Sequence, residues 1–183
     1  MKNNSYMDIN KLTAPLRPEE IEWRVQQQID AKNGKPAKLI VVPYITNRCV
    51  MERFDEQFGW ASWSNEIKEI DGGFLCTITV TLPSGEKVSK TDGAGRTAIE
   101  PVKGGISDAM KRAAVQFGLG RALYTFPKVF VEVDGKFIPE WAIRLLDALV
   151  DSINSGKPQR EVIVLKEEHI RRLQPPQPVR AAA

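Results

Sequence analysis

Five basic side chains lie close together in the middle of the chain, where they could bind a polyanion. The segment from residue 101 to 128 contains five basic residues and one acidic residue, Asp108, which gives it a net charge of +4. Residues 157–183 carry a further +3, although the whole chain nets only +3. Positive charge concentrated in this way predicts a polyanionic partner, because lysine and arginine side chains attract anionic groups. The basic residues of the central segment are Lys103, Lys111, Arg112, Arg121 and Lys128.

The same segment has the periodicity of an amphipathic helix, which we expect over about residues 104–118. Lys111 and Arg112 would project from the side opposite its apolar stripe, so the helix would be cationic. In an alternative interpretation they belong to an ordinary solvated face, where Asp108 and Arg112, four residues apart, form a stabilising ion pair. The stripe consists of Ile106, Met110, Ala113 and Phe117.

Few residues of the chain could serve enzymatic catalysis. His169 is the single histidine, so a Ser-His-Asp or Cys-His site would have to recruit it from the C-terminal extension. The Gly-Lys pairs at 34–35 and 156–157 lack the other residues of a P-loop that binds ATP. Cys49 and Cys76 have no metal-ligand spacing and are expected to be buried free thiols. We therefore predict a non-enzymatic protein that needs no cofactor and no metal.

Acidic residues leave one enzymatic alternative open, a metal-dependent nuclease. Asp92, Asp108, Glu132 and Asp134, with Lys136 nearby, could hold a divalent ion and cut DNA. The Asp-Gly pair that begins at Asp134 is more simply a turn, and the glycine-containing stretch after Asp92 a loop. A third interpretation is a basic protein-interaction module.

The elements that must position these residues indicate an α+β fold. An N-terminal hairpin is expected over 22–29 and 38–43, with its turn at Asn33-Gly34. A helix should follow, capped by Thr46 or Asn47 and ended by Gly59 in a left-handed conformation. Its inward stripe would be Val50, Phe54 and Phe58.

Three further strands with tight turns between them predict an antiparallel meander over 61–70, 74–82 and 86–92. The middle strand alternates most clearly. Apolar side chains at every second position from Phe74 would face the core, and the other face would be rich in threonine and open to water. The helix at 104–118 would pack on the core face and complete a β-β-β-α core.

The C-terminal part should contain a strand over 128–133 and a helix over 139–153. We expect a single domain over 1–155 and a basic, proline-containing extension over 156–183, whose composition disfavours a packed domain. The extension is either solvated or an arm for nucleic acid or for a partner protein, such as a single-strand-binding protein or a recombinase. The chain has no signal-peptide pattern and no apolar run of membrane-spanning length, so a soluble, cytoplasmic protein is expected.

Aromatic rings are a second means of binding nucleic acid, because bases stack on exposed rings. Tyr124 and Phe126, just after the basic helix, are the better candidates for stacking. Four other aromatic residues lie in amphipathic contexts and are expected in the core: Trp60, Trp63, Phe117 and Trp141.

The basic helix also carries a recognisable motif. Residues 107–118, Ser-Asp-Ala-Met-Lys-Arg-Ala-Ala-Val-Gln-Phe-Gly, resemble the signature helix of the Rad52/Rad22 family of single-strand annealing proteins. The continuation over 119–128 and the sequence Pro-Glu-Trp-Ala at 139–142 are similar to bacterial DNA-damage-response and phage members of that family. A weaker likeness runs upstream through Tyr44-Ile45, Arg48 and Glu52-Arg53 to residues 60–63, so the resemblance covers about 40 to 142.

The resemblance implies ATP-independent annealing of complementary single DNA strands in recombination or repair, by a closed homo-oligomeric ring. Members of the family hold the DNA backbone in a basic groove and leave the bases free to pair. By position in the motif, Lys111 and Arg112 are the strongest candidates for phosphate contacts. Val115 stands where eukaryotic members carry a further arginine, so part of their groove is absent or rebuilt here. Weaker candidates are Arg48, Lys103, Arg121 and Lys128.

Overall fold

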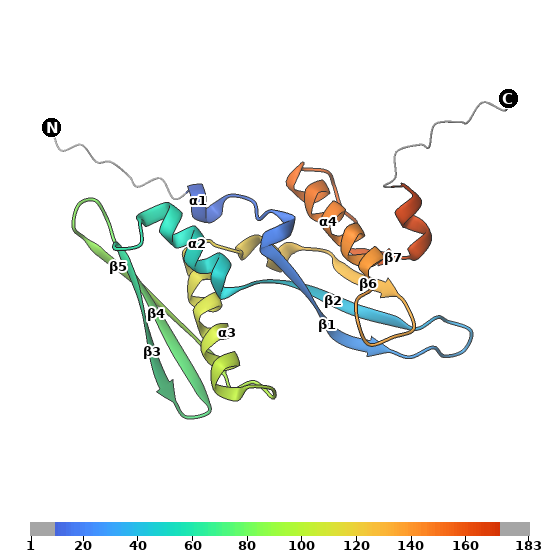
Figure 1. Ribbon diagram of the computed structural model, residues 1–183, viewed down its shortest axis with the longest axis horizontal. Helices are drawn as coiled ribbons and strands as arrows, with labels where there is room; N and C mark the ends of the chain where they lie inside the picture. Colours follow the sequence, from blue (N-terminus) through green and yellow to red (C-terminus); the bar gives the residue numbers. More distant parts are fainter. Residues whose placement is uncertain (1–9, 173–183) are drawn as a thin grey trace. The chain divides into compact units, whose positions relative to one another are not determined.

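The structure is a computed structural model, and it describes residues 10–172 of the 183-residue chain. These residues form two compact units, whose elements are labelled in Figure 1. Unit 1 contains residues 10–16 and 45–125, and unit 2 contains residues 17–44 and 126–172. Both combine helices with a sheet, which confirms the α+β class.

Unit 1 is built on the three antiparallel strands β3 (Trp63–Ile70), β4 (Gly73–Thr81) and β5 (Lys87–Gly95). The outward face of β4 is polar, since the hydroxyl of Thr77 lies 2.7 Å from that of Thr91, and Thr79 lies 2.8 Å from Ser89. The expected meander and the two faces of its middle strand are confirmed. The inward, buried residues of β4 are Phe74, Cys76, Ile78 and Val80.

Helix α3 (Pro101–Gln116) packs against β4 and β5. Its small residues allow a close approach: a Cβ on Gly105 would lie only 2.7 Å from the ring of Phe74 and 3.1 Å from the carbonyl oxygen of Gly95. The expected packing of α3 on the meander is therefore confirmed. The buried side of α3 consists of Gly105, Ala109, Met110, Ala113 and Ala114.

Helix α2 (Asn47–Phe58) has the boundaries that its capping residues predict. The Oγ1 atom of Thr46 accepts a hydrogen bond from the backbone N–H of Cys49 at 3.2 Å, and Gly59 ends the helix with a φ of +83°. Phe54 is fully buried and meets the ring of Phe117, at the end of α3, edge to face with 5.5 Å between the ring centroids. Cys49 and Cys76 are both buried free thiols, as expected.

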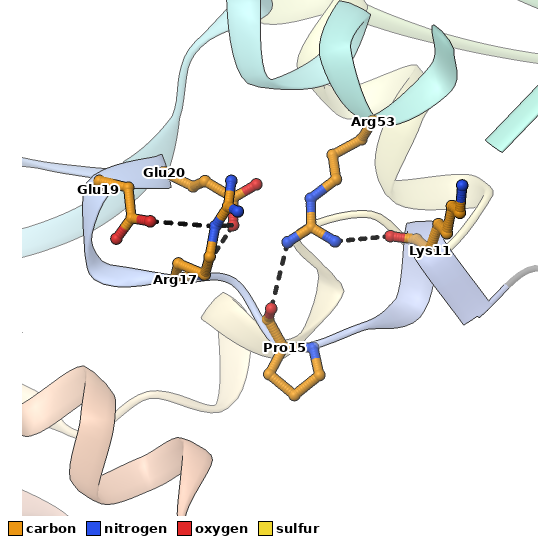
Figure 2. A network of polar contacts seen from close by, with 6 residues as sticks. All are labelled: Lys11, Pro15, Arg17, Glu19, Glu20 and Arg53. Atoms are coloured by element: carbon orange, nitrogen blue, oxygen red, sulfur yellow. Dashed lines mark hydrogen bonds and ion pairs between the residues drawn. The ribbon is translucent and has the colours of Figure 1, made fainter. Parts of the chain in front are cut away.

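A buried arginine ties the start of the described chain to α2. Arg53 donates from Nη1 to the carbonyl oxygen of Lys11 at 2.7 Å and from Nη2 to that of Pro15 at 3.2 Å (Figure 2). These bonds hold the segment that includes helix α1 (Asn10–Thr13), and they satisfy backbone groups that would otherwise need another partner. Unit 1 ends with the 3-10 helix η2 (Arg121–Thr125).

Unit 2 contains a four-stranded mixed sheet in the order β1-β2-β6-β7. Strands β1 (Ile21–Ile29) and β2 (Lys38–Ile45) form the expected hairpin, and Asn33 and Gly34 adopt φ values of +53° and +73° in its turn. Strand β6 (Lys128–Glu132) is antiparallel to β2 and parallel to β7 (Val162–Leu165). The 3-10 helices η1 (Pro18–Glu20) and η3 (Glu167–Arg172) also belong to this unit.

Helix α4 (Glu140–Asn154) covers one face of this sheet with an apolar core. Strand β7 was not anticipated, and it lies beyond the expected domain boundary between residues 155 and 156. Residues 173–183, which hold most of the prolines of the expected extension, lie outside the described residues. No helix of residues 10–172 is both long enough and apolar enough to cross a membrane. The core joins Leu39, Val41, Val129, Val131, Ala142, Leu145, Leu146, Leu149 and Leu165.

Candidate nucleic-acid interface

Arg112 is the most accessible member of the Lys-Arg pair on α3. Its side chain is 52% exposed, and Nε donates to Oδ1 of Asp92 on β5 at 3.1 Å. A guanidinium offers five N–H donors, of which this bond uses one. Arg112 can therefore meet an outside anion while it is tethered to the sheet.

Asp92 is itself held in place. Its Oδ1 atom accepts from the backbone N–H of Gly93 at 2.7 Å, and Gln116, one turn after Arg112, donates to the carbonyl oxygen of Thr91 at 2.7 Å. Partial burial alone would raise the pKa of Asp92, but hydrogen bonds from Gly93, Arg112 and Gln116, together with the charge of Arg112, bring that pKa below 3.8. The carboxylate is therefore ionised at neutral pH.

Lys111 and Lys103 each pair with an acid three residues earlier on or beside α3. Lys111 Nζ lies 2.7 Å from Oδ1 of Asp108, and its side chain is only 20% exposed. Lys103, which is exposed, lies 3.1 Å from Glu100. Asp108 thus pairs with Lys111, whereas Arg112 reaches across to the sheet. Each basic side chain of α3 has a carboxylate beside it, so in this structure the helix is not a bare cationic ridge.

Arg121 caps the C-terminal end of α3. It donates from Nε and Nη2 to the carbonyl oxygen of Val115 at 3.2 and 3.0 Å, and from Nη2 to that of Gln116 at 3.1 Å. Lys90 on β5 donates to the same Gln116 carbonyl at 3.0 Å. Cations at a helix C-terminus satisfy its last carbonyls and interact favourably with its dipole. Arg121 therefore has a structural task besides any contact with DNA.

The remaining two candidate residues belong to elements other than α3. Arg48 is exposed in the first turn of α2, in unit 1. Lys128 is exposed at the start of β6, in unit 2, with Nζ 5.2 Å from the ring centroid of Phe130. Unit 1 thus holds five of the six candidates, three of them on α3.

The aromatic side chains differ in part from expectation. Trp60 is 81% exposed, so its expected place in the core is wrong; it follows Gly59, where the periodicity of α2 no longer fixes its direction. Trp63 is half-buried 5.3 Å from Phe54, and its Nε1 donates to Asp55 at 2.7 Å. Tyr124 is 71% exposed and can reach a ligand, whereas Phe126 packs 6.5 Å from Trp23 in unit 2.

Three of the four carboxylates considered for a nuclease, all except Asp134, form ion pairs with cations in the part of the chain that the structure describes. Asp92 pairs with Arg112 and Asp108 with Lys111, while Glu132 lies 3.7 Å from Lys38 and 3.3 Å from Lys166. Across residues 10–172, no three His, Cys, Asp or Glu side chains come together in a way that could hold a metal ion.

Two side chains that contact α3 were not predicted from the sequence: Lys90, and Asp92 as the partner of Arg112. The pairing of β4 with β5 places Lys90 opposite Ile78 and Asp92 opposite Cys76, which puts both on the face that α3 covers. The signal was the alternation of Val88, Lys90 and Asp92, which could be read only once the register with β4 was fixed.

Comparisons with known proteins agree on one family. The model of the family described as "Rad52/22 family double-strand break repair protein" matches residues 8–140. Single-stranded DNA-binding protein DdrA of Deinococcus radiodurans is 30% identical over 148 residues, which cover 74% of this chain and 67% of that protein. DdrA of Deinococcus deserti is 32% identical over 148 residues, which cover 74% of this chain and 70% of that protein.

Proposed function

The chain belongs to the Rad52/22 family of double-strand break repair proteins, and we propose that it binds single-stranded DNA and anneals complementary strands in repair or recombination. The observation that carries this function is the extent of the match, since residues 8–140 include all of unit 1 that the structure describes and the Lys-Arg pair on α3. The proteins named for single-stranded DNA binding at 30% and 32% identity support the same substrate.

Annealing follows from neutralising phosphates. Cations along one strand reduce its repulsion of a second strand, and contacts to phosphate carry no base information, so pairing itself tests complementarity. We propose that neither ATP nor a metal ion takes part. Since bacterial DNA lies in the cytoplasm and both relatives are bacterial, the protein would act there.

The phosphate contacts would be made chiefly by Arg112 and Lys111. The half-exposed guanidinium of Arg112 is ready for an anion, whereas Lys111 must turn away from Asp108 to offer its ammonium. Arg48 and Lys103 are exposed and would extend the basic surface, and Arg121 and Lys128 remain weaker candidates.

One subunit offers only a short basic surface, because a helix of 16 residues is about 24 Å long. Holding a long strand in order requires repetition of this surface, so we propose a homo-oligomer, closed into a ring by a head-to-tail interface. Residues 156–183 cannot as a whole serve as a free arm for DNA or a protein partner, because β7 pairs with β6 and Leu165 lies in the core of unit 2. Light scattering tests the assembly, and a monomer that anneals at the full rate would rule it out.

An annealing assay tests the function. Two complementary oligonucleotides, one with a donor and one with an acceptor fluorophore, are mixed with the full chain, with and without ATP and with EDTA. We expect the same acceleration in every condition. The variant Lys111→Ala/Arg112→Ala should lose most of it, whereas Arg144→Ala, which removes an exposed arginine from α4, should keep it.

Three results would contradict the proposal. The chain could fail to accelerate annealing, EDTA could abolish the activity, or the double variant could fold and anneal like the wild type. Cleavage of the oligonucleotides that EDTA stops would favour the nuclease instead.

A further inference from the structure

The ion pair between Arg112 and Asp92 differs in kind from the other two on α3. Lys103–Glu100 and Lys111–Asp108 join residues three apart in the chain, so both pairs are local to α3 and its N-cap. Arg112–Asp92 joins α3 to β5, twenty residues earlier in the chain. Of the three ion pairs, Arg112–Asp92 is the one that links α3 to the sheet.

Asp92 lies on the face of β5 that α3 covers, opposite the buried Cys76. Its side chain is 27% exposed, about half the value for Arg112, and its Oδ1 atom is anchored by the Gly93 amide at 2.7 Å. The bond from Gln116 to Thr91 fastens the same stretch of β5 to α3. These bonds hold the carboxylate beside Arg112 in this structure.

A carboxylate and a DNA phosphate are recognised by the same guanidinium donors. A phosphate that takes Nε of Arg112 must displace Asp92. A phosphate that binds elsewhere on the guanidinium comes close to the negative charge of Asp92 and is repelled. In both arrangements the Asp92 carboxylate reduces the contribution of Arg112 to the free energy of DNA binding.

Resting on the proposed function, we infer that Asp92 limits affinity, as a carboxylate built into the chain that competes with the DNA phosphate for Arg112. Each subunit then holds its strand less tightly than its basic residues would allow. An annealing protein benefits from such a limit, because the paired product has to leave the surface that ordered the single strand.

The test is the binding of a fluorescent oligothymidine to the full chain, measured by anisotropy at several salt concentrations. Asp92→Asn removes the charge and keeps an oxygen that can accept from Nε and from the Gly93 amide. We expect it to bind about two- to five-fold tighter, the range that corresponds to one exposed ion pair, with a steeper dependence on salt. Asp151→Asn, which removes an exposed carboxylate from α4, is the matched control and should change affinity much less.

A double-mutant cycle separates competition from a general gain of positive charge. In the Arg112→Ala background, Asp92→Asn should no longer tighten binding. The inference is overturned if Asp92→Asn leaves affinity unchanged, weakens it, or tightens it equally without Arg112. Should Asp92→Asn fail to fold, as judged by a thermal melt, Asp92→Ser takes its place in the same cycle. Failure of the wild type to bind the oligothymidine would count against the proposed function instead.

Discussion

Units 1 and 2 each cover one face of a sheet with a long helix, but their helix–sheet contacts are chemically different. In unit 2, α4 meets the sheet through an apolar core that includes Leu39, Val129 and Leu146. In unit 1, α3 meets β4 through small and apolar residues, yet its contact with β5 includes the Arg112–Asp92 ion pair and the bond from Lys90 to the end of the helix.

The difference leads us to expect the proposed DNA binding at the charged contact of unit 1 and not at the apolar contact of unit 2. Burying apolar surface stabilises a fold by about 25 cal/mol per Å², whereas a partly exposed ion pair contributes about 0–1 kcal/mol. Charges beside α3 therefore add little to the stability of unit 1, although they place a guanidinium where an anion can reach it. We expect substitutions in the apolar core of unit 2 to change folding, and those at the charged contact of unit 1 to change binding.

The largest effect should come from Leu146→Ala, in the core of unit 2. Leu146 is fully buried, so the truncation leaves a cavity and should lower the free energy of unfolding by about 2–5 kcal/mol. Urea denaturation followed by circular dichroism measures the loss. Ile143→Ala, on the exposed side of the same helix, should cost far less. Equal losses for the two variants would mean that α4 does not pack as described.

Gly105→Ala should have the next largest effect, in unit 1. A Cβ there would lie 2.7 Å from the buried Phe74 ring, and overpacking of this kind destabilises a protein by about 1–3 kcal/mol. The higher helix propensity of alanine stabilises by about 1 kcal/mol and offsets only part of this loss. We expect a net loss of stability in urea denaturation. Gly135→Ala, where an added Cβ meets nothing within 4 Å, is the control. A gain of stability for Gly105→Ala would contradict the close approach of α3 to β4.

Arg112→Ala should separate binding from folding. Its loss removes one exposed ion pair, so stability should change by less than about 1 kcal/mol. The slope of log affinity against log salt should become shallower by about 0.7, the value for one phosphate of a single strand. Lys111→Ala should weaken binding less, because Lys111 is largely covered. The reverse order in anisotropy titrations would show that Lys111 is the principal contact.

Local signals in the sequence predicted much of unit 1. The cap at Thr46, the helix end at Gly59 and the alternation of β4 depend on neighbouring residues, so they could be recognised without knowing the fold. Strand β7 depends on distant pairing with β6, and a four-residue apolar run does not distinguish a strand from a helical segment.

For the candidate site, the sequence predicted the helix that carries its basic residues but not the partners of those residues. Arg112 was placed correctly on α3, but its partner Asp92 is fixed by the register of β5, which no local pattern shows. The exposure of Lys111 was overestimated, since a helical pattern gives the direction of a side chain without showing what folds over it.

The smallest predicted effects are those of Asp92→Asn in unit 1 and Asp147→Asn in unit 2, which should change stability at pH 7 in opposite directions. Hydrogen bonds and the charge of Arg112 outweigh burial and lower the pKa of Asp92 in unit 1. Its contribution to stability is therefore present above the unfolded pKa of 3.8 and is lost as the pH falls through the lower folded value. Asp92→Asn should accordingly lower stability slightly at pH 7, within about 0.5 kcal/mol. Thermal melts at pH 7 and pH 3 should show a smaller difference from the wild type at the lower pH.

Asp147→Asn should act in the other direction in unit 2. Burial, followed by the negative charges of Asp151 and Glu19, raises the pKa of Asp147 above 3.8. The folded state then holds the proton more tightly than the unfolded state, so the related stabilisation is present below pH 3.8 and is lost as the pH rises through the folded pKa. At pH 7 the ionised Asp147 carboxylate destabilises the folded state, and substitution by asparagine removes this charge. We therefore expect Asp147→Asn to raise the free energy of unfolding at pH 7 by up to about 0.5 kcal/mol, seen as a slightly higher melting temperature. Near pH 3 the variant should melt like the wild type. A lower melting temperature at pH 7 would show that the Asp147 carboxylate stabilises α4, and the contrast with Asp92 would then fail.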